Sequence, residues 1–401
     1  MKSVFLIFTL FILLSVAIVS RAQEEEDLSD RFGFDPSFRV SKELNFPTRN
    51  QEDDSISARF GFYNQADGSN DSGGNSFVDE EETVYEAIIV LDKTISERDR
   101  LNVRLLGDLV SSASIAKMNN PTYRSLQSNP SGNKRGEVGL GWNHRFDEFS
   151  LGGNASISAE FSRYYSTGYG SNISFPFNHD NTTFGFSFQG YYDHFQNKTF
   201  SGQNDGYVNR QSYTLDGNLT QVLTPKTIFN LNIHYTQQLG YLATTYYSVL
   251  VGGVEMQEVA PDNRRRNAFT GRIKRNLTFL SSLELGYRFY NDSWDINSHT
   301  IDTRFSQYIW KRKMILEPNY RFYIQDSAFF YQKVFIAPQT YMTSDPDLGS
   351  FNGHIFGLKA VLLRPDFLPI GNADLDSTFN YYLRSDHLNI FWITAGYTLR
   401  F

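Results

Sequence analysis

The stretch from Leu388 to Phe401, LNIFWITAGYTLRF, decides the fold. One set of alternate positions is apolar: Phe391, Ile393, Ala395, Tyr397, Leu399 and Phe401. The positions between them are small or polar from the middle of the stretch onward: Thr394, Gly396, Thr398 and Arg400. A period of two puts these sets on opposite sides of a β-strand. The pattern therefore predicts a strand whose two faces meet different surroundings.

Runs of the same kind recur along most of the chain, separated by breaks rich in Gly, Asn, Asp and Ser. They occupy residues 56–63, 84–94, 101–114, 137–146, 151–161, 170–178, 182–195, 210–223, 227–240, 267–279, 281–291, 296–309, 314–327, 351–363, 374–385 and 388–401. This gives about 16 strands, with about 14 as the alternative, because such boundaries are good to a few residues. Bacterial membrane barrels close with an even number of antiparallel strands. We predict an all-β fold, a closed antiparallel transmembrane β-barrel over residues 55–401.

The length of the runs and the order of their connections favour a barrel over an exported soluble all-β protein. Many runs last about 10–14 residues, enough for a tilted bilayer crossing, whereas strands in soluble sheets average about 5–6 residues. No repeat of the length expected for a propeller is present. Short turns alternate with long links at 64–82, 115–135, 196–209, 241–266 and 328–350. We therefore expect the apolar faces to point outward to lipid.

Composition excludes several other classes of protein. The 401 residues include no cysteine, 16% are aromatic, and the formal charge is −7. A mean hydropathy of −0.41 excludes a helical membrane protein. The acidic balance disfavours nucleic acid as a partner, and the lack of cysteine excludes a disulfide scaffold or a thiolate metal site. No two histidines have the spacing of metal ligands, so we expect neither a metal nor a cofactor.

The N-terminus has the features of a secretory signal. Lys2 supplies a positive charge, Val4 to Val19 form an apolar run, and Ser20-Arg21-Ala22 has the form of a cleavage site. We predict a signal peptide over residues 1–22, followed by a short acidic periplasmic segment over residues 23–54. The alternative, a transmembrane anchor, is disfavoured because the run is short and acidic residues follow at once.

The C-terminal strand resembles the last strand of bacterial outer-membrane barrels. In those proteins a terminal Phe and alternating apolar positions mark the chain for the barrel-assembly machinery, and here they correspond to Tyr397, Leu399 and Phe401. The resemblance implies an outer-membrane location, reached after export, and the assembly machinery as a partner during biogenesis.

A second resemblance covers about residues 80–401. The segment Trp294-Asp295-Ile296-Asn297-Ser298-His299-Thr300 follows Tyr287-Arg288-Phe289-Tyr290. It is similar to an uncharacterised family of Gram-negative outer-membrane β-barrels that carries a W-D-x-x-x-H-T segment, matched here by Trp294, Asp295, His299 and Thr300. The resemblance implies a barrel in the outer membrane and assigns no activity.

Alternation places three acids and three arginines on the inner faces of three consecutive runs: Glu284, Arg288, Asp302, Arg304, Glu317 and Arg321. Charges removed from water must pair or stay hydrated. Two interpretations stay open. The six form a network that stiffens the wall, or they line a path and select permeating solutes.

Three Asp and His combinations invite a catalytic interpretation: Asp295/His299/Asp302, Asp193-His194 and Asp386-His387. Strict alternation places His299 on the face opposite Asp302. The motifs of outer-membrane proteases and phospholipases are absent. We therefore expect no enzyme and assign no catalytic residue.

Arg264, Arg265 and Arg266 form the densest basic cluster, at the end of the longest loop. The three arginines are a candidate contact for lipopolysaccharide phosphates, with a solvated loop end as the alternative. The body of that loop, Thr244 to Met256, is apolar. It either extends a hairpin outward, folds into the lumen or contacts another envelope protein.

The first functional hypothesis is a pore for small polar solutes, because barrels of this size leave an aqueous channel. The alternative is an interaction or assembly scaffold with an occluded lumen, whose outer loops bind a partner protein. A hydrolase at the rim is a distant third. Outer-membrane lipid and lipopolysaccharide are the expected surroundings.

Overall fold

The computed structural model describes residues 54–66, 82–112, 133–160, 163–201, 203–244, 247–365 and 372–401. The predicted signal peptide and the acidic segment up to residue 53 lie outside these ranges. Among the described residues, no helix is both long and apolar enough to span a membrane.

Nearly every described element is a strand, and two single-turn 3₁₀ helices complete the set. The elements are β1 (Ser55–Ala66), β2 (Glu82–Thr94), β3 (Asp99–Ser112), β4 (Asn133–Arg145), β5 (Ser150–Glu160), β6 (Tyr164–Phe177), β7 (Thr182–Lys198), β8 (Asn204–Thr224), β9 (Thr227–Gly240), β10 (Ser248–Val251), β11 (Val254–Gln257), β12 (Asn263–Asn276), β13 (Ser281–Asp292), β14 (Asn297–Ile309), η1 (Trp310–Arg312), β15 (Met314–Gln325), η2 (Pro346–Leu348), β16 (Phe351–Leu363), β17 (Ala373–Arg384) and β18 (Asn389–Arg400).

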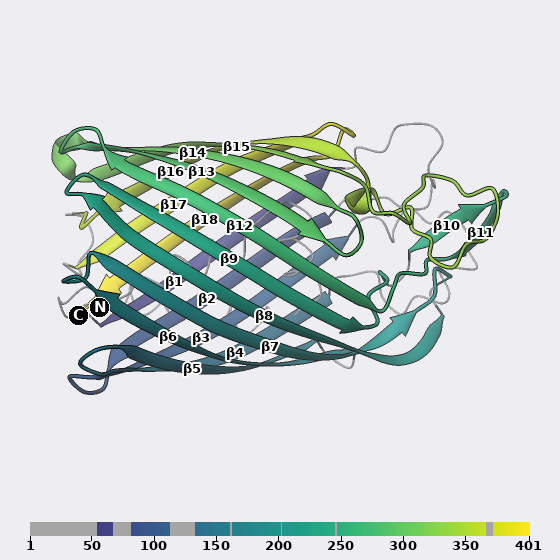
Figure 1. The fold of residues 1–401 in the computed structure, drawn as a ribbon, viewed down its shortest axis with the longest axis horizontal. Helices are drawn as coiled ribbons and strands as arrows, with labels where there is room; N and C mark the ends of the chain where they lie inside the picture. The colour runs from purple at the N-terminus through teal and green to yellow at the C-terminus, as the bar shows by residue number, and fades with distance from the viewer. Residues whose placement is uncertain are drawn as a thin grey trace, which may run out of the picture.

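Sixteen of these strands close into one antiparallel barrel (Figure 1). Each strand pairs with its neighbours in the chain, except that β9 pairs directly with β12. The seam pairs β1 with β18, from Ser55 opposite Arg400 to Ala66 opposite Asn389. The predicted closed barrel of about 16 strands is confirmed.

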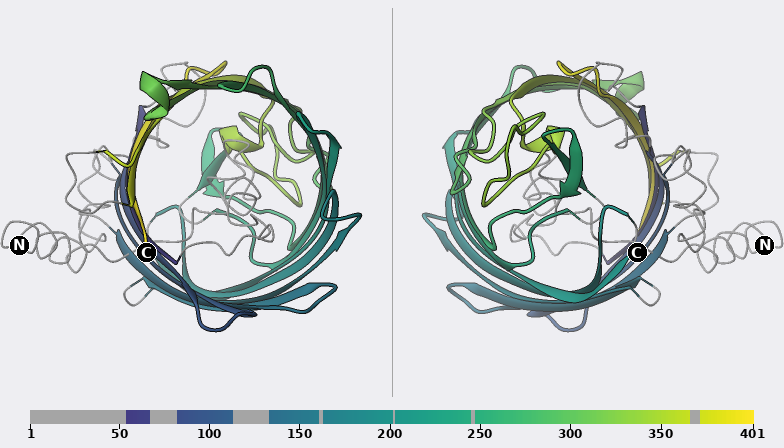
Figure 2. Two further views of the ribbon diagram at one scale, coloured as in Figure 1. Left: turned by 90° about the vertical axis from the view of Figure 1, so that its left-hand side faces the viewer. Right: turned by 90° about the vertical axis from the view of Figure 1, so that its right-hand side faces the viewer.

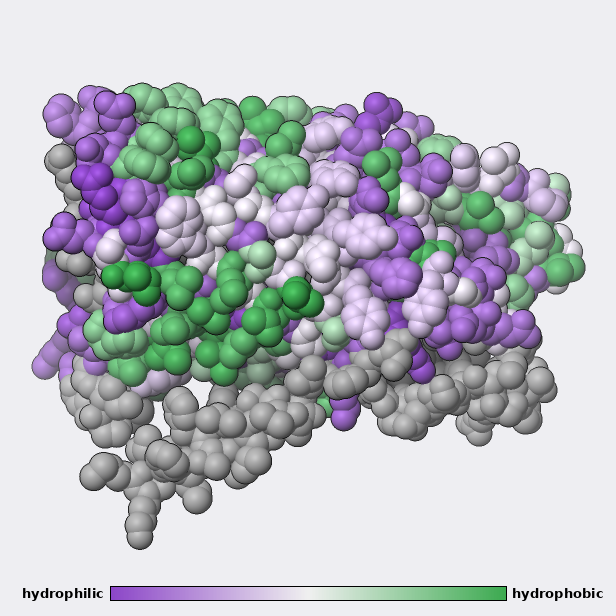
Figure 3. All heavy atoms as spheres, turned by 90° about the horizontal axis from the view of Figure 1, so that it is seen from below, coloured by the Kyte–Doolittle hydropathy of each residue, from purple (hydrophilic) through white to green (hydrophobic). Residues whose placement is uncertain are grey.

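The two faces of the wall have opposite character. Residues directly opposite each other in antiparallel strands share a face. The register therefore fixes, for every strand of the ring, which alternate residues face inward and which face outward. The outward positions are apolar and accessible; for example, Leu140 is 54% exposed and Ile157 is 67% exposed. On the face seen in Figure 3, apolar and weakly polar residues cover much of the middle of the barrel, and strongly hydrophilic residues gather towards the ends. The apolar faces point outward, as the alternation predicts.

The two rims differ in the length of their connections. Short turns join strands at the rim that holds the described termini, and the longest described loops extend from the opposite rim (Figure 1). The strands β10 and β11 belong to the β9–β12 loop (residues 241–262) and form a separate two-stranded sheet. Its turn is Gly252-Gly253, with φ of 58° and 86°, the conformation that a two-residue hairpin turn requires.

The β9–β12 loop packs on the β15–β16 loop (residues 326–350). Val249 and Val251 form a small buried core with Phe335 and Met342, and Val251 bridges to Phe335 through the backbone. Viewed along the barrel axis, this pair of loops lies within the outline of the ring (Figure 2). The apolar loop body therefore folds on its neighbour over the mouth of the barrel.

Candidate functional site

The interior of the barrel is too wide for its own wall to fill. Neighbouring strands lie about 4.8 Å apart and barrel strands tilt by about 40°. Sixteen strands with these parameters close a cylinder roughly 30 Å across, measured between backbones. Side chains fill a barrel of about eight strands, whereas about 16 leave room for water. The inner face is therefore the candidate functional surface.

The predicted charge network lies on that inner face. Arg321 Nε lies 2.5 Å from Asp302 Oδ1, between β15 and β14. Arg304 Nη1 lies 4.0 Å from Glu284 Oε1, between β14 and β13. The side chains of Arg304 and Glu284 remain 29% and 21% exposed. These pairs brace the wall and also leave charge in contact with solvent.

The other two members of the predicted set lie on the same three strands. Arg288 stands in register with Thr270 and Thr300, with its guanidinium 5.9 Å from the Tyr290 ring centroid. Glu317 accepts a hydrogen bond from Ser306 Oγ at 2.7 Å and stands opposite Lys359 on the neighbouring strand β16. The structure thus brings all six residues onto one wall, and a role in solute selection stays a prediction.

Two further basic residues on β12 join this wall although the sequence pattern did not single them out. Arg272 stands opposite Gly286, and Lys274 stands opposite Glu284. Both have the parity of inward positions, and Lys274 is exposed. Extending the alternation argument one strand towards the N-terminus would have found them.

An acidic cluster lies half-way round the barrel and was not predicted either. Arg135 on β4 contacts Glu137 at 2.8 Å and Asp108 on β3 at 3.9 Å. Glu86 stands opposite Asp108, and Glu160 stands opposite Arg135. Carboxylates therefore outnumber cations in this part of the inner face.

The outer end of β13 is held by a buried carboxylate, Asp292. Arg264 donates from Nε and Nη2 to Asp292 Oδ2 at 2.8 and 2.6 Å, and the Tyr290 hydroxyl donates to the same oxygen at 2.8 Å. The backbone N–H groups of Trp294 and Ile296 donate to Oδ1 at 2.9 and 3.1 Å. Asp292 lies in the run Asn291-Asp292-Ser293, and turn-forming residues of this kind are the sequence signal of an Asx turn, which could have identified this residue.

The arginine cluster assigned to lipopolysaccharide does not form one exposed patch. Arg264 is buried, with its guanidinium 4.2 Å from the Trp294 ring centroid. Arg266 points inward on the same strand, in register with Asp292, and only Arg265 is exposed on the outer face. The three side chains separate because β12 begins at Asn263 and a strand sends successive side chains to opposite faces. Contact with lipopolysaccharide stays a prediction.

The members of the W-D-x-x-x-H-T segment have separate places. Trp294 is buried against Ala328 and Phe330 of the β15–β16 loop, and Asp295 lies in the turn with φ of 69°. His299 is outside, with Nδ1 2.8 Å from the Tyr287 hydroxyl. Thr300 is buried on the inner face. The first part of the segment, at Trp294 and Asp295, is thus a turn that packs on the β15–β16 loop, and His299 and Thr300 belong to β14.

None of the three Asp and His combinations forms a catalytic arrangement. His299 and Asp302 lie on opposite faces, as alternation predicts. Asp193 points inward to Arg210, while His194 points outward to Asn209. Asp386 contacts Arg384.

One chain of hydrogen bonds has the order of a hydrolase triad, from Asp216 through His234 to Thr236. Thr236 is only 4% exposed, and its hydroxyl lies 2.8 Å from that of Thr214. This chain therefore links β8 to β9 and offers no accessible nucleophile.

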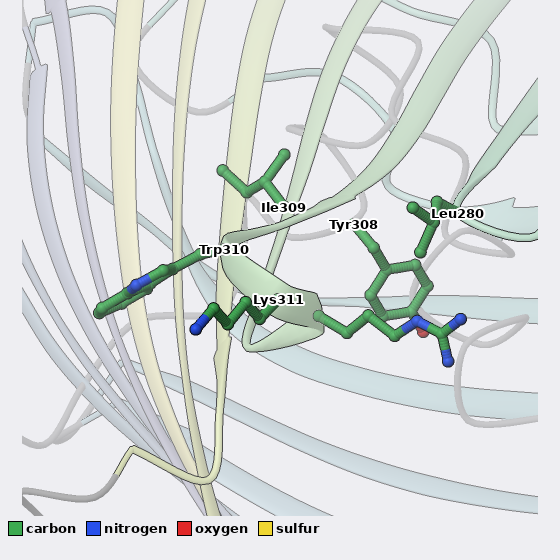
Figure 4. Close-up of a pocket in the computed structure, with 6 residues that line it drawn as sticks. Leu280, Tyr308, Ile309, Trp310 and Lys311 are labelled. Carbon is green, nitrogen blue, oxygen red and sulfur yellow. The ribbon is translucent and has the colours of Figure 1, made fainter.

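Within the described ranges, no group of three or more acidic or histidine side chains is placed to hold a metal ion. A shallow pocket lies at the turn between β14 and β15, on the rim that holds the termini (Figure 4). It is lined by Leu280, Tyr308, Ile309, Trp310, Lys311 and Arg312. Aromatic and basic residues at a rim suit a membrane interface, and the pocket is separate from the inner face.

The residues of the predicted barrel-assembly signal all face outward. Phe401 is 59% exposed, and its backbone N–H donates to the carbonyl of Asp54 at 2.9 Å. Tyr397 and Leu399 share its face on β18. Recognition of this strand by the assembly machinery stays a prediction.

Comparison with known proteins gives a family and several distant structural likenesses. The family model described as "Protein of unknown function (DUF3570)" matches residues 37–389. No curated protein matches the chain.

Three solved structures illustrate the structural likenesses. A bacterial polysaccharide outer membrane secretin has a TM-score of 0.49 and 8% identity, covering 86% of this chain and 98% of its own. A BenF-like porin from Pseudomonas fluorescens Pf-5 has a TM-score of 0.45 and 8% identity, covering 88% and 100%. The siderophore receptor PirA from Acinetobacter baumannii has a TM-score of 0.45 and 11% identity, covering 83% and 54%. At such identities no function is transferred from their names.

Proposed function

This chain belongs to the DUF3570 family, and we propose that it is an outer-membrane β-barrel that forms a water-filled channel for small polar solutes. The observation that carries the proposal is the combination of an accessible apolar outer face with a polar inner face around a closed ring of sixteen strands.

The outer face supports the membrane part of the proposal. Soluble monomers rarely expose apolar patches larger than a few hundred Å², whereas exposed apolar residues here come from every quarter of the ring. Examples are Phe60, Val138, Phe186, Ile233, Ile301 and Phe356. Lipid provides the surroundings in which such a surface is stable.

The inner face supports the channel part. Its charges are hydrated or paired, as with Arg59, whose side chain stays 42% exposed while it contacts Asp376. Its neutral positions are mostly Ser, Thr, Asn, Gln and Gly, including Asn218, Asn230 and Asn232 on β8 and β9. Such a surface suits water and polar solutes.

A second function, an interaction scaffold at the outer rim, is favoured by a different observation. The paired outer loops expose apolar side chains far from the barrel wall: Ile336 is 95% exposed and Val254 is 64% exposed. An envelope protein with an apolar contact surface would cover them.

Planar-bilayer recording of the refolded barrel separates the two functions. We expect discrete conductance steps in potassium chloride for a channel. A protein that folds and inserts without conducting would contradict the channel function and favour the scaffold function.

A further inference from the structure

Side chains of opposite charge face each other across the inside of the barrel. In the strand order, each of β12–β15 lies half-way round the ring from one of β2–β5. The strands of these two groups are therefore the most distant partners that the cylinder allows, at roughly 30 Å between backbones.

The first group is basic on its inner face. Apart from the buried Arg264–Asp292 pair at the outer end, its carboxylates are Glu284, Asp302 and Glu317. Its basic residues, here called the basic wall, are more numerous: Arg266, Arg272, Lys274, Arg288, Arg304 and Arg321. This excess stands out in a chain whose overall charge is −7.

The second group is acidic on its inner face. Its carboxylates, here called the acidic wall, are Glu86, Asp92, Asp108, Glu137 and Glu160. Its cations are fewer: Arg100, Arg104, Arg135 and, at the strand end, Arg145. One of these cations, Arg135, lies between two carboxylates, Asp108 and Glu137.

The strands between the walls divide in the same sense. On β16–β18 and β1 the inward cations Arg59, Lys359, Arg384 and Arg400 outnumber the carboxylates Asp374 and Asp376, and on β6–β9 Asp193 and Asp216 outnumber Arg210. Arg210 contacts Asp193 at 3.0 Å on one side, and Arg59 contacts Asp376 at 3.2 Å on the other. Among the described residues, the inner face is therefore positive over β12–β18 and β1 and negative over β2–β9, and the basic and acidic walls belong to these opposite halves of the ring.

We propose that the two walls impose a transverse electric field on the solute path and favour small zwitterions, molecules that carry one carboxylate and one ammonium group. This inference rests on the proposed channel function. A zwitterion lowers its energy by turning its carboxylate towards the basic wall and its ammonium towards the acidic wall. A neutral solute of the same size gains nothing, and a simple ion is attracted by one wall and repelled by the other.

The size of the preference follows from Coulomb's law. One unit charge brought to about 4 Å from another in water changes an equilibrium by about fivefold. The screening length is about 30 Å at 0.01 M salt and about 3 Å at 1 M. The opposite charge of a small zwitterion lies only a few bonds away and offsets part of this energy. The preference for a zwitterion should therefore be at most about fivefold at low salt and should vanish at 1 M.

Alanine and lactamide provide a matched pair of probes, because they are isomers and only alanine is a zwitterion. Swelling of phosphatidylcholine vesicles that contain the refolded barrel should be faster with alanine at low salt. The variants Arg272→Gln/Arg288→Gln and Glu86→Gln/Asp92→Asn should each bring the two rates together. The control Arg275→Gln, on the outer face of β12, should keep the wild-type ratio. Equal rates for the wild type would overturn the inference while leaving the channel standing.

Reversal potentials in a potassium chloride gradient give an independent measurement that reports only on folded, conducting protein. Neutralising the basic wall should shift selectivity towards potassium, and neutralising the acidic wall should shift it towards chloride. Shifts in the same direction, or none, would contradict a transverse field. A wild-type protein that inserts without conducting would instead contradict the proposed channel function.

Discussion

The guanidinium of Arg264 donates two hydrogen bonds to a single oxygen of Asp292, at 2.8 and 2.6 Å, and lies over the Trp294 ring. The Asp292 side chain has no exposed surface. The contact connects the start of β12 to the end of β13 and to the turn that supports the β15–β16 loop. A pair that looks like surface charge in the sequence is thus a buried anchor.

Arg264→Ala should destabilise the barrel by about 3–5 kcal/mol, because it leaves a buried carboxylate without its cation. Arg265→Ala is the matched control on the next residue, where the side chain is exposed, and it should change stability by less than about 0.5 kcal/mol. Urea unfolding of the inserted protein, followed by tryptophan fluorescence, measures both. Similar midpoints for the two variants would show that Arg264 is not an anchor.

The barrel could be predicted from sequence because its wall repeats one physical rule. Each strand must present apolar residues to one side and polar residues to the other, so alternation gave the strand count and the inner position of Asp302 and Arg321. The same rule gave the outer position of His299. No comparable rule covers contacts between loops, such as Val251 with Phe335, since their partners are far apart in the chain.

The arginine cluster shows a second limit of the pattern. Arg264, Arg265 and Arg266 share one loop surface only if the loop continues to Arg266. The strand begins at Asn263 instead. An error of a few residues in the predicted start of the strand therefore turns a predicted surface patch into one outward side chain, Arg265, and two inward ones, Arg264 and Arg266.

Gly353 on β16 is required by the Tyr382 ring that covers it. A Cβ at this position would enter the ring well inside van der Waals contact, and Tyr382 is only 1% exposed, so the ring has no room to move. Gly353→Ala should therefore cost about 1–3 kcal/mol. Gly271→Ala is the control, because no atom lies within 4 Å of the position that its methyl group would take. Equal urea midpoints for the two variants would contradict this packing argument.

Arg384 ties the β15–β16 loop to the wall of the barrel. It contacts Asp347 in the loop, and its guanidinium lies 4.5 Å from the Phe351 ring centroid. Arg384→Gln should release this attachment and speed amide hydrogen exchange between residues 343 and 349. Asp386→Asn removes only the partly exposed partner of Arg384 and should leave exchange in the loop unchanged. Unchanged exchange in Arg384→Gln would mean that the loop core alone holds this segment.

The carboxylate of Asp54 joins the start of β1 to the end of β2 at the rim that holds the termini. Hydrogen bonds from Lys93 and from the Thr94 backbone lower the pKa of Asp54 from 3.8 to about 2. Since the pKa is lower in the folded state, the contribution of this contact is complete above about pH 4 and is lost as pH falls through 2. A carboxyl NMR titration should find a midpoint near 2, and Lys93→Gln should raise it towards the ordinary value. An unshifted midpoint in the wild type would show that Lys93 does not hold Asp54 in solution.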